Sequence, residues 1–181
     1  MPEKNYTPLE FIFDMAEITV KALAVLLIAM TFFVRQVTVD GPSMNDTLHD
    51  KDRLAVHTFM YEPQPQDIVI VAHGKNLDKM IIKRVIAVGG QNIDLNYAKN
   101  EVSVDGVLLH EDYIKGKTVK PAVSPLKKTN FVIPDGYVFV MGDNRENSTD
   151  SRSALVDLVP VQNIIGRAFF RFFPFDKIGT L

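Results

Sequence analysis

The sequence has 181 residues, a formal net charge of −2 and no cysteine. A chain of this length suits one globular domain with an appendage, and the small net charge provides no basic field for nucleic acid. The absence of Cys excludes a disulfide framework, a cysteine nucleophile and a thiolate zinc site. The four histidines show no metal-ligand spacing, so we expect neither a metal nor a cofactor: His49, His57, His73 and His110.

An apolar segment near the start, residues 16–34, contains two charged side chains, Glu17 and Lys21. As a helix, its 19 residues would span about 28 Å, close to the bilayer core of about 30 Å. We predict a transmembrane anchor here, between an N-terminal segment 1–15 and a domain 35–181. Two alternatives remain: a buried core helix, or a cleaved signal peptide, although no A-x-A-like cleavage site follows the segment.

The anchor is followed by a predicted strand, Arg35–Val39, and then by a Gly41-Pro42 turn that leads into Ser43. Such a turn exposes a hydroxyl at the end of a strand. It also frees backbone N–H groups that can stabilise a developing oxyanion. Ser43 is therefore a candidate nucleophile, although most Gly-Pro-Ser turns are only turns.

A lysine lies in the middle of the predicted strand Met80–Gly89. Alternation along the strand places Lys83 on one face with aliphatic neighbours such as Ile81 and Val85. Burial there would lower the lysine pKa from about 10.4 toward neutrality, and the neutral amine could act as a general base. The alternative is an edge-strand lysine that prevents aggregation.

Short runs rich in Val, Ile and Phe, separated by Gly, Pro and Asn-Asp turns, continue to the end of the chain. They predict a mainly β fold, a sandwich or barrel-like sheet. The motif around Asp105-Gly106 predicts a hairpin, and a polar, Lys-rich stretch predicts an inserted lobe at about 100–132. Short helices are expected near 153–158 and 160–164. The strands not yet named are Arg53–Thr58, Ile68–Ala72, Asn92–Leu95, Glu101–Val104, Tyr137–Met141 and Ile164–Phe173.

The most distinctive stretch is Tyr137–Arg152, in which a strand ends at Gly142-Asp143-Asn144 and a dense polar run follows. Together with Ser43-Met44 and Lys83-Arg84, and with the N-terminal anchor, it resembles the bacterial type I signal peptidases, particularly the single-anchor Gram-positive forms. The resemblance covers nearly the whole chain. It implies a signal-peptidase-type β-sheet catalytic domain with a small inserted lobe, preceded by one transmembrane helix.

The resemblance also implies a role for each matching residue. Ser43 would be the nucleophile, with its backbone N–H in the oxyanion hole, and Lys83 would be the general base. Ser148 would orient the Lys83 amine. Two ion pairs would support the site, Asp143 with Arg84 and Asp150 with Arg152. Met44 and Gly41 would lie near the substrate pocket.

Two positions depart from the family pattern. Asp46 stands where the family usually has Pro, which puts the stiffness of the loop after the nucleophile in doubt. Some relatives have, at the position of Gly41, a Ser whose hydroxyl aids the oxyanion. This chain has Gly there, as the Gram-positive forms do, so no such hydroxyl is available. Neither departure removes the Ser–Lys dyad.

The expected function is cleavage of signal peptides from exported preproteins that carry small residues at positions −1 and −3. The apolar segment ends nine residues before Ser43, so the site would lie close to the membrane surface. We therefore expect a single-pass plasma-membrane protein with a cytoplasmic N-terminus and an extracytoplasmic catalytic domain. The lipid bilayer and preproteins are its expected partners, and nucleic acid is not.

Several alternatives stay open. A specialised pilin or conjugation peptidase would share the chemistry, and so would an autoprotease of the LexA type, although the chain shows no helix-turn-helix region. A catalytically impaired homologue would act as a membrane-tethered binding module. Asp46 is the one feature that favours this last reading.

Overall fold

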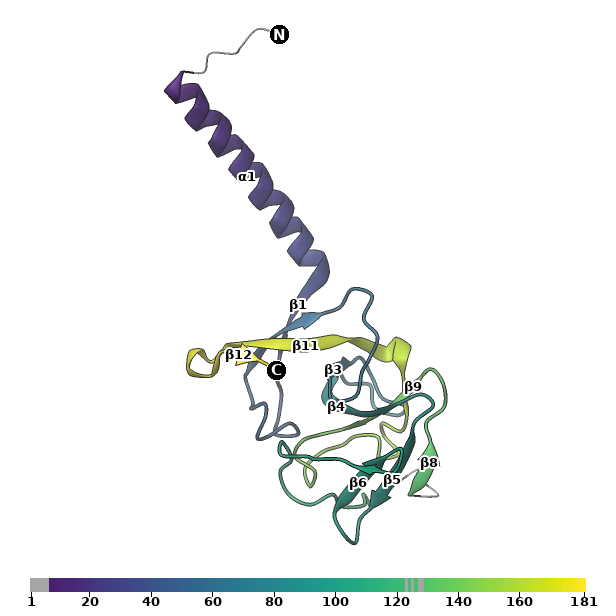
Figure 1. Ribbon diagram of the computed structural model, residues 1–181. Coiled ribbons are helices and arrows are strands. Elements are labelled where there is room, and N and C mark those ends of the chain that lie inside the picture. The colour runs from purple at the N-terminus through teal and green to yellow at the C-terminus, as the bar shows by residue number, and fades with distance from the viewer. Residues whose placement is uncertain (1–6, 123, 125, 127–128) are drawn as a thin grey trace.

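The computed structural model, which describes residues 7–122, 124, 126 and 129–181, places one N-terminal helix on a β-sheet domain (Figure 1). The predicted mainly β class is confirmed. The predicted N-terminal segment 1–15 is described only from Thr7, and Lys127 and Lys128 of the Lys-rich insertion lie outside the described residues.

Helix α1 spans Pro8–Phe33 and so begins eight residues before the predicted segment 16–34. The earlier start has a local cause. Thr7 and Glu10 form a reciprocal capping box, in which the Thr7 N–H donates to Glu10 Oε2 at 2.9 Å and the Glu10 N–H donates to Thr7 Oγ1 at 3.3 Å. Proline at the first helical position suits this end. Among the described residues, no helix has both the length and the apolar character required to cross a membrane.

The larger sheet contains eight strands among the described residues and runs in the order β1-β2-β11-β3-β4-β9-β10, with β12 paired to β11. Its named pairs are all antiparallel. Strand β1 follows α1 directly and lies at one end of this order. The strands are β1 Val34–Thr38, β2 Arg53–His57, β3 Ile68–Val71, β4 Ile81–Val88, β9 Tyr137–Met141, β10 Val159–Pro160, β11 Ile164–Phe173 and β12 Gly179–Thr180.

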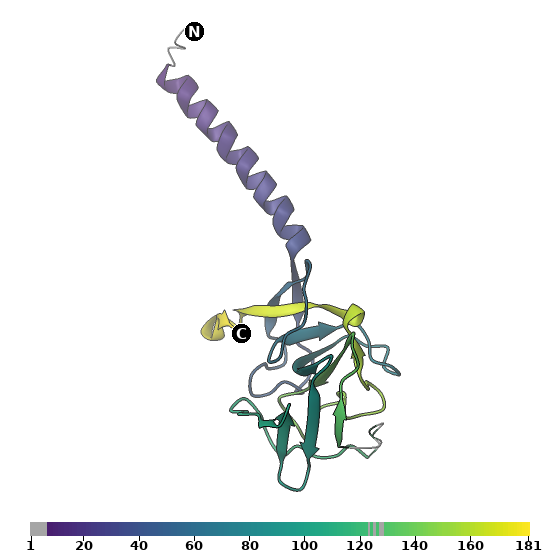
Figure 2. The same ribbon diagram turned by 45° about the vertical axis from the view of Figure 1, so that its right-hand side comes forward.

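The smaller sheet has the order β7-β6-β5-β8 and lies at the opposite end of the domain from α1, as both views show (Figure 2). It begins at Asn92, ahead of the predicted insertion at about 100. The predicted hairpin is confirmed, because Asp105 and Gly106 adopt φ values of 51° and 79° between β6 and β7. The bounds are β5 Asn92–Asn96, β6 Glu101–Val104, β7 Val107–Leu108 and β8 Asn130–Val132.

Buried aliphatic side chains lie on both faces of the central strands, and all four residues of β3 are buried. A third cluster joins Ile86 and Phe139 of the larger sheet to Ile93 and Leu95 of the smaller one. The two sheets thus share a continuous core, which holds the ends of β4 and β9 in place beside the turn after β1.

Of the two short helices predicted near the C-terminal end, the structure contains one. A 3-10 helix, η1, covers Val161–Asn163 inside the predicted 160–164 helix. The helix predicted near 153–158 is wrong. Residues 151–156 form turns, in which the Val156 and Asp157 N–H groups both donate to the Ser153 carbonyl. Asp157 adopts a left-handed φ of 57°, which ends any helical continuation. A second 3-10 helix, η2, covers Phe175–Lys177.

Candidate active site

The turn after β1 is held by hydrogen bonds on both sides. The Val39 N–H donates to the Asp52 carbonyl at 2.8 Å, and the Gly41 N–H donates to Asp50 Oδ1 at 3.0 Å. Gly41 has a φ of +88°, a left-handed conformation that glycine adopts at little cost. The turn therefore presents Ser43 at the end of the strand. The Ser43 N–H donates no hydrogen bond among the described residues, so it remains available to an oxyanion.

Lys83 of β4 reaches the Ser43 hydroxyl. Its Nζ lies 2.8 Å from Ser43 Oγ and donates a second hydrogen bond of 2.9 Å to the Ile82 carbonyl. The side chain is 2% exposed. This burial lowers the lysine pKa to about 8, although Asp150 and Asp143 act in the opposite direction. A large fraction of the amine is therefore neutral near pH 8 and able to accept a proton.

The loop after β9 clamps the Ser43 turn. The Asn144 N–H donates to the Ser43 carbonyl at 3.1 Å, and Asn144 Nδ2 donates to the Pro42 carbonyl at 3.1 Å. A Cβ at Gly142 would overlap both the Ser148 side chain and the Ser43 carbonyl oxygen, so only glycine fits there without movement. The predicted third segment and the nucleophile turn are thus in direct contact.

Arg84 and Asp143 form a buried bidentate ion pair. Arg84 Nε and Nη2 lie 2.9 and 2.6 Å from the two Asp143 oxygens. The guanidinium also stacks 4.1 Å from the Tyr113 ring centroid. Asp143 accepts a further bond of 2.6 Å from Thr47 Oγ1 in the loop after Ser43. The pair therefore links β4, the loop after β9 and the loop after Ser43.

Asp150 and Arg152 form a second buried ion pair, with contacts of 2.8 Å from Arg152 Nε and Nη2. Asp150 Oδ2 also accepts the Gly142 N–H at 3.0 Å. Burial opposes the negative charge, but Arg152, with smaller contributions from Ser148 and the Gly142 N–H, holds the pKa of Asp150 below its usual range. This pair fixes the path of the loop that contacts Ser43.

The structure does not place Ser148 as a hydrogen-bond partner of Lys83. The two Lys83 Nζ contacts are to Ser43 and Ile82. Ser148 Oγ is buried and makes no well-formed hydrogen bond with any described residue. It lies close enough to the Asp150 carboxylate to lower the pKa of that group as a weak hydrogen-bond donor. The predicted orienting contact is therefore absent from this arrangement.

A third buried arginine pair is one that the sequence does not predict. Arg145 Nη1 lies 3.0 Å from Glu111 Oε2 and 2.9 Å from Thr118 Oγ1, and Arg145 Nη2 contacts Glu111 Oε1. Glu111 and Thr118 belong to the inserted region, so the pair connects that region to the loop after β9. No local sequence pattern connects Glu111 and Arg145, which are 34 residues apart. The one sign of the pair in the sequence is that Arg145 lies in the distinctive Tyr137–Arg152 stretch.

Asp46, the residue that departs from the family pattern, points to the inserted region. Its Oδ1 lies 2.9 Å from Lys115 Nζ, in an exposed ion pair. The Lys115 backbone in turn bonds to Asp143 and Arg145. The loop after Ser43 therefore has an external tether where a proline ring is otherwise expected, although exposed pairs contribute only about 0–1 kcal/mol.

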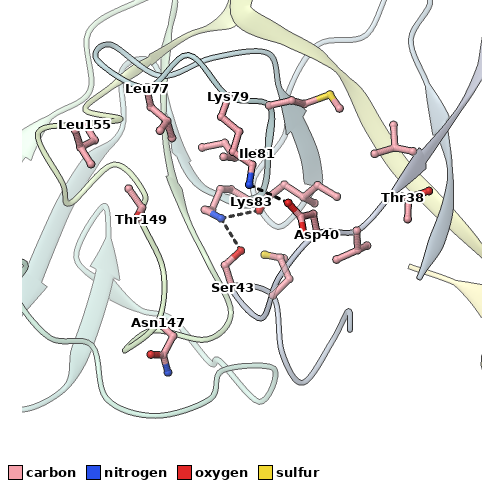
Figure 3. Close-up of a pocket in the computed structure, with 15 residues that line it drawn as sticks. Thr38, Asp40, Ser43, Leu77, Lys79, Ile81, Lys83, Asn147, Thr149 and Leu155 are labelled. Atoms are coloured by element: carbon pink, nitrogen blue, oxygen red, sulfur yellow. Dashed lines mark hydrogen bonds and ion pairs between the residues drawn. The ribbon is translucent and has the colours of Figure 1, made fainter. Parts of the chain in front are cut away.

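A cleft with a volume of about 440 Å³ opens beside Ser43 and Lys83 (Figure 3). One wall runs from β1 to Ser43, another runs into β4, and Asn147, Thr149 and Leu155 form a third side. Met44 lines this cleft. Gly41 lines a neighbouring hollow instead, together with Pro42 and Asn45. The remaining lining residues are mostly apolar: Val37, Thr38, Val39, Asp40, Leu77, Lys79, Met80, Ile81 and Ile82.

This arrangement provides the Ser43 hydroxyl, a buried amine in contact with it, a Ser43 N–H that donates no hydrogen bond within the described part of the chain, and an adjacent cleft. Such a set supports acyl transfer through a covalent serine intermediate. In the part of the chain that the structure describes, His, Asp and Glu side chains form no group of three that could hold a metal ion.

Comparison with known proteins gives consistent matches. Residues 12–173 match the family described as "Signal peptidase, peptidase S26". "Probable signal peptidase I-1" of Synechocystis sp. is 37% identical, over 97% of this chain and 89% of that protein. "Signal peptidase IB" of Staphylococcus aureus is 35% identical, over 86% of each chain. A crystal structure of a signal peptidase I from Enterococcus faecalis V583 is 27% identical, covers 59% of this chain and 97% of that one, and has a TM-score of 0.45.

Proposed function

Because this chain belongs to the bacterial type I signal peptidases of the peptidase S26 family, we propose that Ser43 and Lys83 form the dyad with which it works. The protein is a serine endopeptidase that removes signal peptides from preproteins. The observation that carries the proposal is the 2.8 Å contact between the buried Lys83 Nζ and Ser43 Oγ beside the cleft.

In the proposed cycle, the neutral Lys83 amine accepts the Ser43 proton while Ser43 Oγ attacks the scissile carbonyl carbon. The Ser43 N–H stabilises the resulting oxyanion. The C–N bond then breaks, Lys83 returns the proton to the leaving amine, and an acyl-enzyme remains. Lys83 next removes a proton from water as the water oxygen attacks the ester carbon. The bond between that carbon and Ser43 Oγ then breaks, and Lys83 returns the proton to Ser43, which regenerates the hydroxyl and the neutral amine.

We propose that the surrounding ion pairs position this dyad. Asp143 with Arg84 would hold the nucleophile loop through Thr47, and Asp150 with Arg152 would hold the loop that clamps Ser43. Ser148 would turn toward the Lys83 amine and hold it against the Ser43 hydroxyl, in place of the Ile82 carbonyl. The Ser148 hydroxyl is buried and makes no well-formed hydrogen bond among the described residues, so a turn toward the amine would satisfy it at little cost.

The substrate would bind in extended form. Strand β1 lies at an end of the strand order, and its continuation forms one wall of the cleft, so a peptide can add to it by backbone pairing. Small side chains at −1 and −3 would point into the apolar cleft, with Met44 on its floor. The preference for small side chains is expected from the family, and the mostly apolar lining of this cleft is compatible with it.

The full chain in detergent is expected to cleave a preprotein with an A-x-A site after the second Ala, because the dyad stands beside the cleft. Ser43→Ala should leave no product, whereas Ser103→Ala, on the smaller sheet, should cleave normally. Mass spectrometry of the new N-terminus identifies the bond. A folded wild-type protein that cleaves nothing would instead support the impaired binding homologue, and product from Ser43→Ala would refute the nucleophile assignment.

We further propose that α1 attaches the enzyme to the plasma membrane, with residues 1–15 in the cytoplasm and the domain 35–181 outside. The helix projects away from the sheets in both views, and its apolar side chains, including Phe13, Leu23 and Leu27, are exposed. Glu17 and Lys21 pair with each other along the helix, which lowers the cost of bringing both charges near lipid. An exposed apolar helix of this kind requires a partner such as a bilayer.

The absence of native cysteine makes this topology directly testable. Lys99→Cys, in the domain, should react with a membrane-impermeant maleimide in intact cells from which any outer barrier has been removed. Leu9→Cys, in the first turn of α1, should react only after permeabilisation. The wild-type chain is the blank. Equal labelling of both variants in intact cells, or recovery of the protein in the soluble fraction, would contradict the proposed attachment.

A further inference from the structure

An ion pair crosses the rim of the Ser43 cleft. Lys79 Nζ donates a 2.9 Å hydrogen bond to Asp40 Oδ2, and both residues line the cleft. Asp40 lies three residues before Ser43, and Lys79 lies four residues before Lys83. The pair therefore joins the two walls that carry the dyad, and Figure 3 shows it beside the contact between Lys83 and Ser43.

This ion pair is exposed and easily opened. The Lys79 and Asp40 side chains are 61% and 67% exposed, so water screens their attraction and competes for both groups. Lys79 nevertheless lowers the pKa of Asp40, which therefore stays ionised at neutral pH. A peptide that enters the cleft therefore meets one cation, Lys79, and one anion, Asp40. Each of them can leave the other and pair with a charged group of the peptide.

The substrate position that meets the pair follows from strand geometry and rests on the proposed function. Successive side chains of an extended peptide point to opposite sides. If the side chains at −1 and −3 point into the apolar cleft, the side chain at −2 points outward to the rim. The exposed Asp40 and Lys79 lie at this rim.

We propose that Asp40 and Lys79 are specificity-determining residues that accept a charged substrate side chain at position −2. An acidic side chain takes Lys79 as its partner and a basic one takes Asp40, while the released group turns into solvent. Because the two charges offset each other, the intact pair tolerates either sign. Removal of one member leaves a single charge at the rim and creates a preference.

Peptide binding by the full chain carrying Ser43→Ala tests this directly, because it does not depend on turnover. Three fluorescent signal-peptide segments differ only in Asp, Gln or Lys at −2, and anisotropy gives each Kd. The parent should bind the Asp and Lys peptides about equally. Adding Asp40→Asn should favour the Asp peptide about fivefold, and adding Lys79→Gln should favour the Lys peptide about fivefold.

Two controls isolate the ion pair. The inverted pair, Asp40→Lys with Lys79→Asp, should return the ratio to about one, and Lys75→Gln removes a lysine of an ion pair that does not line the cleft. High salt should reduce both preferences. Unchanged ratios in both single variants, or no peptide binding at all, would overturn the proposal. Failure of wild-type cleavage with shifted binding ratios would refute the proposed catalysis but support charge selection at −2 by the same cleft in a peptide-binding homologue.

Discussion

Replacing Lys83 with Met is expected to lower kcat/KM for preprotein cleavage by about 10³-fold, because general-base assistance contributes about 10²–10⁴-fold. Met occupies a similar volume without a proton-accepting group, so Ser43 loses the amine that lies 2.8 Å from its hydroxyl. Lys75→Met, at an exposed lysine outside the cleft, is the matched control and should retain full activity. Cleavage by Lys83→Met at the wild-type rate would refute the base assignment.

The same residue determines the pH dependence of the wild-type enzyme. Since the neutral amine is the reactive form, activity should rise as pH increases through about 8, the pKa to which burial lowers Lys83. The folded-state pKa lies below the unfolded value of about 10.4, so the unfolded state binds more protons between these limits. Lys83 therefore costs stability below about pH 8, and Lys83→Met should raise Tm at pH 7.

Replacing Asp150 with Ala is expected to destabilise the domain by about 3–5 kcal/mol, because it leaves the Arg152 charge buried without its carboxylate. Both side chains are fully buried, and Asp150 also accepts the Gly142 N–H. For a domain of this size the loss corresponds to a fall in Tm of about 10 °C. Thermal unfolding followed by circular dichroism measures it.

The matched control for Asp150 is Asp46→Ala, which breaks the exposed ion pair with Lys115. Exposed pairs contribute about 0–1 kcal/mol, so this variant should unfold within about 3 °C of the wild type. Similar Tm values for Asp150→Ala and wild type would mean that the buried pair does not stabilise the loop that clamps Ser43. Activity loss in Asp46→Ala without a Tm change would instead assign the Lys115 tether a catalytic role.

Local signals in the sequence account for most of the elements that formed. Alternating Val and Ile runs predicted the long strands, and Asp105-Gly106 predicted the hairpin, because both depend on neighbouring residues. The apolar pattern does not extend to the start of α1, which is determined instead by the capping box of Thr7 and Glu10. The turns at 151–156 replaced a predicted helix because tertiary contacts hold the buried Ser151 and Arg152 in place.

The sequence by itself determined which residues are the candidates for the chemistry, because Ser43, Lys83 and the Gly142–Arg152 segment lie in motifs that are readable along the chain. It implied the contact between Lys83 and Ser43, 40 residues apart, only through the family resemblance, and it did not indicate that Arg145 pairs with Glu111. Those contacts arise from the register of β3, β4 and β9 and from the packing of the two sheets. The tertiary structure alone decides burial, and burial lowers the Lys83 pKa, since a buried amine loses the hydration that stabilises its charge.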